Sequence, residues 1–213
     1  MIKYPKKILI VYDDEFPIAL NLAKEFELLS IKTNLFIPNK TEHWLNRLVF
    51  KKINKLARNL RIVPKGTTLF MGSKYSYTNY LELQFSKRIN EFQPELIFCI
   101  HGQRFGEKIL SASKIPKIAW WIEPDPNKET LTYHASPFDL YLSYDSEVVA
   151  YLNQKGIASK YQSHVSDPTQ FHPIQNSMKT TDILFYGNWS EWREEILHSA
   201  YMVTKNIALY GNG

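Results

Sequence analysis

The sequence of 213 residues contains a single cysteine, Cys99, and no long apolar run. One cysteine excludes a disulfide within the chain and any metal site built from several cysteines. The apolar stretches are shorter than the core of a secretory signal or a membrane-spanning helix requires. We therefore expect a soluble protein without a transmembrane segment, located in the reducing cytoplasm.

Several short sequence motifs that mark known enzyme classes or metal sites are also absent. No G-x-S-x-G elbow, no P-loop and no G-x-G-x-x-G after the first apolar run occurs, which argues against an esterase, an NTPase and a standard dinucleotide enzyme. No two histidines have the i, i+4 spacing that is typical of metal ligands on one helix. The six histidines are His43, His101, His134, His164, His172 and His198. We expect no metal site.

What the chain does have is ample apolar material and an uneven positive charge. Hydrophobic residues make up 44% of the sequence, enough for a sizeable core, and the formal net charge is +5. Much of the positive charge lies between Arg47 and Lys65, where apolar residues recur at helical spacing. They are Trp44, Leu45, Leu48, Val49, Ile53, Leu56, Ala57 and Leu60. This pattern predicts one amphipathic basic helix over residues 47–61.

The basic helix has two interpretations. It is a solvated helix face, or it makes the chain a non-enzymatic binding module that contacts nucleic acid or an anionic membrane surface. Nucleic-acid binding favours aromatic side chains interleaved with the charges, and only Trp44 and Phe50 are near. We therefore expect no specific nucleic-acid partner.

Apolar runs alternate with helical patterns along most of the chain. We expect strands at residues 7–12, 33–37, 95–100, 117–122, 140–143 and 160–162. We expect helices at 17–29, 47–61, 77–92 and 145–155, and a short helix that follows Gly106 and ends at residue 113. This alternation predicts an α/β fold with a Rossmann-like parallel sheet. The run 95–100 is almost continuously apolar, as in a central strand that is buried on both faces.

The chain becomes irregular from Val165 to Lys179, where Pro168 and Pro173 interrupt it, and a new strand, helix and strand follow at 182–187, 191–202 and 207–210. We therefore predict a first lobe at 1–164, an interdomain linker at 165–181 and the start of a second Rossmann-like lobe at 182–213. One β-α-β unit cannot cover both faces of its sheet, so we expect this second lobe to be truncated here.

Polar residues follow several of the predicted strands. Ligands of open parallel sheets bind outside the carboxyl ends of the strands. The residues at these ends are Asp13, Asp14, His101, Gly102, Glu123, Asp125, Gly187 and Asn188. His101 is a candidate base or acceptor contact because a histidine pKa lies near neutral pH, and a structural turn histidine is the alternative.

Glu123 and Asp125 are also candidate catalytic residues, since they match the acid-x-acid signature of metal-dependent, single-lobed glycosyltransferases. Their prolines, Pro124 and Pro126, favour a structural loop instead.

Gly187 and Arg193 are suited to a phosphate group. Gly187 lacks a side chain, so the backbone and the following helix N-terminus can approach a diphosphate closely. Arg193 is expected one or two turns into that helix, where it can pair with phosphate oxygens. A plain turn after the strand is the alternative.

Four segments stand in the order found in one family. They are residues 118–126 (IAWWIEPDP), 138–145 (FDLYLSYD), 165–173 (VSDPTQFHP) and 182–188 (DILFYGN), the last with Arg193. In this order the chain resembles spore-maturation CgeB-type glycosyltransferases, which belong to the two-lobed GT-B class. The resemblance covers the last half of the chain closely and the first half only by its β-α alternation.

The resemblance implies a glycosyltransferase whose first lobe binds the acceptor and whose second lobe binds a nucleotide-sugar donor without a metal. Together with their positions at strand ends, this makes His101, Glu123 and Asp125 of the first lobe candidate catalytic residues, and Gly187, Asn188 and Arg193 candidates for the donor diphosphate side. The donor is a co-substrate, no other cofactor is expected, and the acceptor is a glycan, a protein or a small molecule.

The family's acidic residue for the donor ribose and its late helix facing the diphosphate have no counterpart in this sequence. We therefore expect the chain to be inactive alone, either as a segment of a longer protein or as half of a split enzyme with a complementary chain.

Overall fold

The structure is a computed structural model that describes residues 4–12, 17–64, 68–100, 107–122, 128–169, 171–175 and 178–211. The chain divides into two compact units, residues 1–165 and 166–213. The assignment of an acceptor-side and a donor-side lobe to these parts of the chain stays a prediction.

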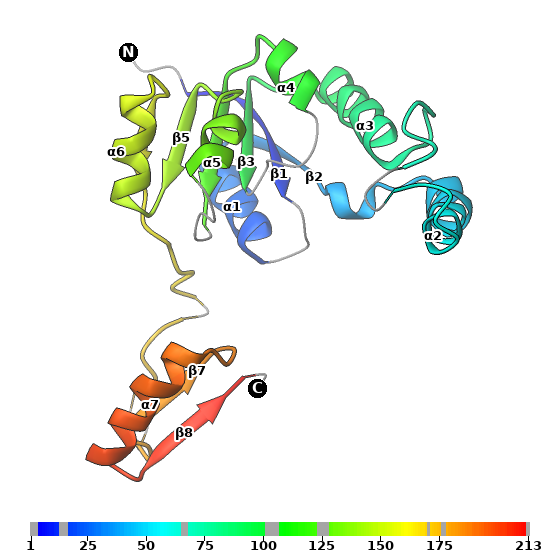
Figure 1. The fold of residues 1–213 in the computed structure, drawn as a ribbon. Helices are drawn as coiled ribbons and strands as arrows, with labels where there is room; N and C mark the ends of the chain where they lie inside the picture. The colour runs from blue at the N-terminus through cyan, green and yellow to red at the C-terminus, as the bar shows by residue number, and fades with distance from the viewer. Residues whose placement is uncertain are drawn as a thin grey trace. The chain divides into compact units, whose positions relative to one another are not determined.

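The first unit is built on a six-stranded parallel sheet in the order β2-β1-β3-β4-β5-β6 (Figure 1). The strands are β1 (Lys7–Tyr12), β2 (Lys32–Phe36), β3 (Leu96–Ile100), β4 (Lys117–Trp121), β5 (Leu140–Ser143) and β6 (Ser159–Tyr161). Strand order reverses between β1 and β3, which makes their carboxyl ends the topological switch point of the sheet. The predicted α/β, Rossmann-like fold class is confirmed.

Helices cover both faces of this sheet. The helices that cover it are α1 (Pro17–Leu28), α3 (Tyr77–Phe92), α4 (Glu107–Ala112), α5 (Lys128–Ala135) and α6 (Ser146–Gln154). Between β2 and α3 the chain forms the short 3-10 turn η1 (Pro38–Lys40), the π-helical turn η2 (Asn46–Phe50) and α2 (Lys51–Asn59). Residues of α1 pack with Ile8 and Ile10 on one face, while residues of α3, α4, α5 and α6 pack with Leu9 and Val11 on the other. Because both faces are covered, the residues of β1 from Ile8 to Tyr12 and all residues of β3 are apolar.

Local signals in the sequence set several helix ends. The Ser76 hydroxyl oxygen accepts from the Asn79 N–H at 3.4 Å and caps α3, and Asp145 Oδ1 accepts from the Glu147 N–H at 2.8 Å and caps α6. Gly156 follows α6 with a φ of 78°, a conformation that glycine adopts without strain. The helix expected over 145–155 is confirmed as α6.

Two elements differ from the expectation. Helix α5 was not predicted, because threonine, tyrosine and histidine are weak helix formers. It forms because Leu131 and Ala135 are buried in the core, so tertiary packing stabilises a poor local sequence. The basic helix expected over 47–61 is present, but it begins as the π-helical turn η2 before continuing as α2.

The second unit contains β7 (Ile183–Tyr186), α7 (Glu191–Val203) and β8 (Ile207–Tyr210). The two strands are parallel, with Ile183 opposite Ile207 and Tyr186 opposite Tyr210. No described residue of this unit is buried, because one helix and two strands cover little of each other. Local hydrogen bonds hold it instead, such as the one that the Thr204 hydroxyl donates to Asp182 Oδ2 at 2.6 Å.

Across the described parts of both units, no helix combines the length and the apolar character needed to cross a membrane. A cytoplasmic location stays a prediction.

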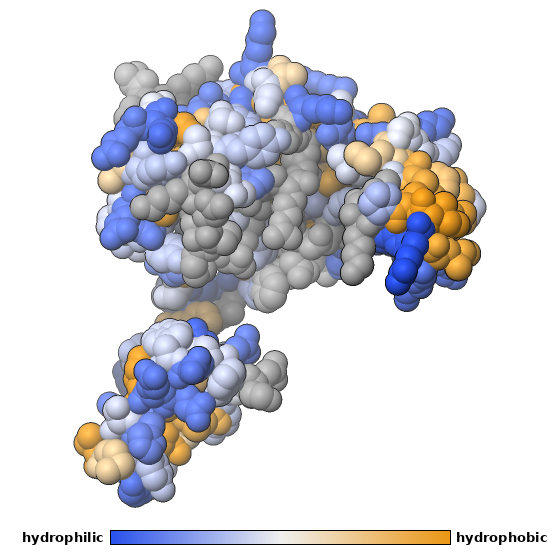
Figure 2. All heavy atoms as spheres, in the orientation of Figure 1, coloured by the Kyte–Doolittle hydropathy of each residue, from blue (hydrophilic) through white to orange (hydrophobic). Residues whose placement is uncertain are grey.

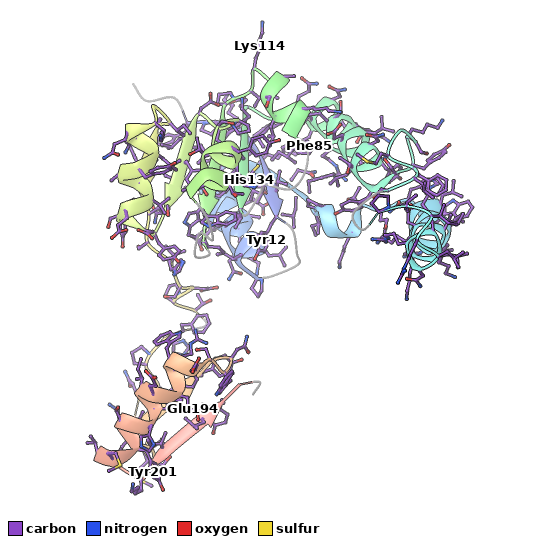
Figure 3. The ribbon with its side chains drawn as sticks, in the orientation of Figure 1. Tyr12, Phe85, Lys114, His134, Glu194 and Tyr201 are labelled. Atoms are coloured by element: carbon purple, nitrogen blue, oxygen red, sulfur yellow. The ribbon has the colours of Figure 1, made fainter. Side chains whose placement is uncertain are left out.

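The core assignment can be tested at Phe85, which is labelled in Figure 3. Phe85 is fully buried, and its ring centroid lies 5.1 Å from that of Phe36. We expect Phe85→Ala to lower the free energy of unfolding by about 3–5 kcal/mol, measured by denaturant titration, because it leaves a cavity. Leu83→Ala is the control on the same helix, since Leu83 is 54% exposed. Equal losses for both variants would contradict the core assignment.

Candidate functional site

The carboxyl ends of three strands adjoin in the first unit. Tyr12 of β1 is paired with Ile100 of β3, and Ile100 is paired with Trp120 of β4. The segments that follow these strands therefore leave the sheet at neighbouring points of one edge, around the switch point. The predicted residues on these segments lie outside the described residues, so their roles stay predictions. They are Asp13, Asp14, His101, Gly102, Glu123 and Asp125.

Trp120 brings a buried polar group close to this edge. It is 3% exposed, and its indole Nε1 has no hydrogen-bond partner among the described residues. An unpaired buried donor costs about 1–3 kcal/mol, and such groups are rare enough in folded proteins to mark places of interest. Sequence reasoning did not select Trp120, because a tryptophan within an apolar strand resembles ordinary core.

His164 contacts the residue that follows β4. Its Nε2 lies 3.1 Å from the carbonyl oxygen of Ile122, to which it donates, and its ring centroid lies 4.4 Å from that of Tyr144. The chain after β6 is thereby held against the end of β4. No local sequence pattern predicts this contact, since the two residues are 42 positions apart.

A groove of about 440 Å³, lined by polar and apolar residues, lies on the first unit between α3, α4 and the loop before α3. It is lined by Gly72, Lys74, Asn79, Glu82, Leu83, Ser86 and Ile109. Asn79 Nδ2 donates to the carbonyl oxygens of Met71 at 2.8 Å and Ser73 at 3.0 Å, which fixes the loop to the helix. This groove was not predicted from the sequence, although Asn79, Glu82 and Ser86 recur at helical spacing on one side of α3.

In the second unit, two glycines meet where β7 and β8 end. The Gly187 N–H donates to the Tyr210 carbonyl oxygen at 2.9 Å, and a Cβ added at Gly211 would overlap the Gly187 carbonyl oxygen. Gly211 also has a φ of 150°, which residues with a side chain rarely adopt. The close approach of these two backbones therefore depends on glycine at position 211.

Arg193 folds back from α7 over the end of β7. Its Nη1 donates to the Asn188 carbonyl oxygen at 2.7 Å, and its guanidinium carbon lies 5.9 Å from the centroid of the Phe185 ring. A Cβ at Gly187 would lie 3.3 Å from the same Nη1, so the missing side chain leaves room for the guanidinium. The structure thus brings Gly187, Asn188 and Arg193 together, while their role in binding stays a prediction.

Gly187 and Arg193 border a pocket of about 170 Å³ within the second unit. Its lining comprises Phe185, Gly187, Trp189, Arg193, Glu194, Leu197, Leu209, Tyr210 and Gly211. Glu194, labelled in Figure 3, accepts a hydrogen bond from the Trp189 indole N–H at 2.9 Å through Oε2. The pocket therefore combines an apolar floor with one cation and one carboxylate.

The N-terminus of α7 opens beside this pocket. Ser190 occupies the N-cap position, but its side chain makes no capping hydrogen bond, and its buried Oγ has no partner among the described residues. The partial positive charge of a helix N-terminus favours an anion there. Glu191 and Glu194 in the first turn oppose an anion, whereas Arg193 favours one. Anion binding at this place therefore depends on Arg193.

Within the described ranges, no three His, Cys, Asp or Glu side chains gather where they could hold a metal ion. Metal independence stays a prediction.

No protein-family model and no curated protein matches the chain. Among solved structures, it is similar to the UDP-GlcNAc 2-epimerase from Neisseria meningitidis bound to UDP-GlcNAc, with 12% identity and a TM-score of 0.47. The match covers 97% of this chain and 66% of the epimerase chain, so this chain spans just under two thirds of that enzyme's length. At this identity and TM-score, the match carries no argument about activity.

The glycine contact at the pocket can be tested with Gly211→Ala. We expect the backbone amides of β7 and β8, above all that of Gly187, to exchange with solvent faster, because the added Cβ forces the two strand ends apart. Hydrogen exchange followed by NMR measures the change. Gly72→Ala is the matched control, since a Cβ there meets nothing within 4 Å. Unchanged exchange in Gly211→Ala would contradict the close contact.

Proposed function

We propose that this chain is part of a nucleotide-sugar-dependent glycosyltransferase of the two-lobed GT-B class, similar to CgeB-type enzymes. The second unit is the donor side in this proposal, and the first unit is the acceptor side. One observation carries it: Gly187, the Arg193 guanidinium and the N-terminus of α7 meet beside a pocket at the carboxyl end of a parallel β-α-β unit.

The donor in this proposal is a sugar joined to a nucleoside diphosphate. Backbone N–H groups after Gly187 and at the start of α7 suit the phosphate oxygens, because they are donors in a region of partial positive charge. Arg193 adds a charge-assisted hydrogen bond. A fixed cation beside the diphosphate stabilises the negative charge that builds up as the sugar departs. In this proposal, Arg193 stabilises the charge of the leaving diphosphate, which a bound metal ion does in other enzymes.

The reaction forms a bond between an acceptor hydroxyl oxygen and the anomeric carbon of the sugar, while the bond from that carbon to the diphosphate breaks. The hydroxyl proton passes to a base, for which His101 is our candidate, with Glu123 and Asp125 as further candidates on the acceptor side. The adjoining carboxyl ends of β1, β3 and β4 support this assignment. The segments that carry the candidate residues follow β3 and β4 and begin at the same edge of the sheet.

Arg193 provides the first test of the donor site. We expect UDP or GDP, added to the 213-residue chain, to shift the backbone NMR signals of Gly187, Asn188 and the first turn of α7. Arg193→Ala should weaken this binding about tenfold or more, because it removes a charge-assisted hydrogen bond to phosphate. EDTA should leave the titration unchanged if no metal takes part.

The matched control is Lys205→Ala, which removes a cation that lies over the Tyr201 ring beyond the far end of α7. Figure 3 labels Tyr201 toward that end of the helix. Signal shifts that are the same in Arg193→Ala and in the unmodified chain would contradict the proposed donor site.

Glu194 provides a second test with the opposite sign. Its carboxylate borders the same pocket, so it repels a diphosphate bound there. We expect Glu194→Gln to tighten UDP binding several-fold, measured by the same titration, because the amide keeps the shape of the side chain without its charge. Glu195→Gln on the same helix removes one charge outside the pocket lining and should have little effect. Weaker binding by Glu194→Gln would show that the carboxylate serves the ligand instead of opposing it.

A further inference from the structure

The positive charge of the protein is concentrated in one segment of the first unit. Between Glu42 and Glu82 the chain has no Asp or Glu and eight basic residues, which are Arg47, Lys51, Lys52, Lys55, Arg58, Arg61, Lys65 and Lys74. The whole chain has 26 basic and 21 acidic residues, so the part outside this segment is net negative. The segment therefore accounts for the entire positive net charge.

The same segment exposes large apolar side chains. Leu56 is 58% exposed, Leu60 61% and Met71 70%. The exposed apolar set is Trp44, Leu48, Ile53, Leu56, Leu60, Ile62, Leu69 and Met71, and together with the basic residues around it we name it the α2 surface. Figure 2 shows apolar side chains gathered over α2 and the neighbouring turns, with strongly hydrophilic ones beside them. Exposed apolar surface of this extent in one place marks an interaction site.

The exposure of these side chains does not come from a loose segment. Asn54 is buried, and its Oδ1 accepts from the Leu69 N–H at 2.9 Å, which ties α2 to the turn before α3. The Phe50 and Phe70 rings stack with centroids 4.2 Å apart and planes 11° apart. The segment is thus internally packed through these residues while its aliphatic side chains face solvent.

The two kinds of residue occupy different sides of α2. Ile53, Leu56 and Leu60 recur at intervals of three and four and share one side of the helix. Asn54 and Ala57 are its buried positions. Lys52 and Lys55 are exposed and flank the apolar side. An exposed helix with an apolar side bordered by Lys and Arg is typical of helices that lie in the interface of an anionic membrane.

We propose that the α2 surface docks the first unit onto a bilayer that contains anionic lipids. The aliphatic side chains enter the boundary between headgroups and acyl chains, and the Lys and Arg side chains contact the lipid phosphates. A nucleic acid fits this surface less well, because it would leave the aliphatic side chains in water. Stacking on bases also requires free aromatic faces, and Phe50 and Phe70 already stack on each other.

Vesicle flotation of the 213-residue chain tests this proposal. We expect the chain to float with phosphatidylcholine vesicles that contain phosphatidylglycerol, and to do so less with phosphatidylcholine alone or at high salt. The double variants Leu56→Glu with Leu60→Glu, and Lys52→Glu with Lys55→Glu, should each reduce the bound fraction about tenfold. All four residues are exposed, so circular dichroism should show an unchanged fold.

The matched control is Leu28→Glu with Leu29→Glu, which adds the same charge at two leucines that are 78% and 70% exposed at the end of α1. This control should float like the unmodified chain. Absence of flotation by the unmodified chain, or an equal loss in the control, overturns the proposal. So does binding of a single-stranded oligonucleotide that requires Lys52 and Lys55 but not Leu56 and Leu60, when no vesicle binding occurs.

Discussion

Burial of β1 and β3 on both faces is the constraint on which the rest of the structure depends. Leu9, Ile10, Ile97 and Cys99 are fully buried, so this pair must lie in the centre of the sheet with helices on both sides. The central position of β1 and β3 fixes the switch point between them. The segments that follow β1, β3 and β4 therefore begin at the same edge of the sheet. Core packing thus determines which strand ends precede the candidate acceptor residues.

The fold was predictable because its signals are local. The apolar runs, the cap at Asp145 and the stop at Gly156 each depend on a few neighbouring residues, and the helix expected over 77–92 is α3. Helix α5 escaped prediction because distant packing of Leu131 stabilises it. The candidate site follows the same rule. Gly187 and Arg193 are close in the chain and could be paired from sequence. The contact of Gly187 with Gly211, and the Trp120 Nε1 that has no partner within the described ranges, depend on strands brought together by folding.

The two units are stabilised by different interactions. The first has a buried core on both faces of its sheet, whereas no described residue of the second is buried. Local hydrogen bonds and the glycine contact therefore set the shape of the second unit's pocket. In the first unit, the turn before α3 carries both Met71 of the α2 surface and Gly72 of the groove between α3 and α4. Under the membrane proposal, docking brings this groove close to the lipid headgroups.

The proposed donor site requires that a nucleoside diphosphate bind where β7 meets α7. A crystal structure of the chain with UDP tests it most directly. We predict that the diphosphate lies within hydrogen-bond distance of the Arg193 guanidinium and of backbone N–H groups between Gly187 and the first turn of α7. A diphosphate bound instead at the carboxyl edge of the first unit's sheet, near Trp120, would contradict the account and move the donor site to the other unit.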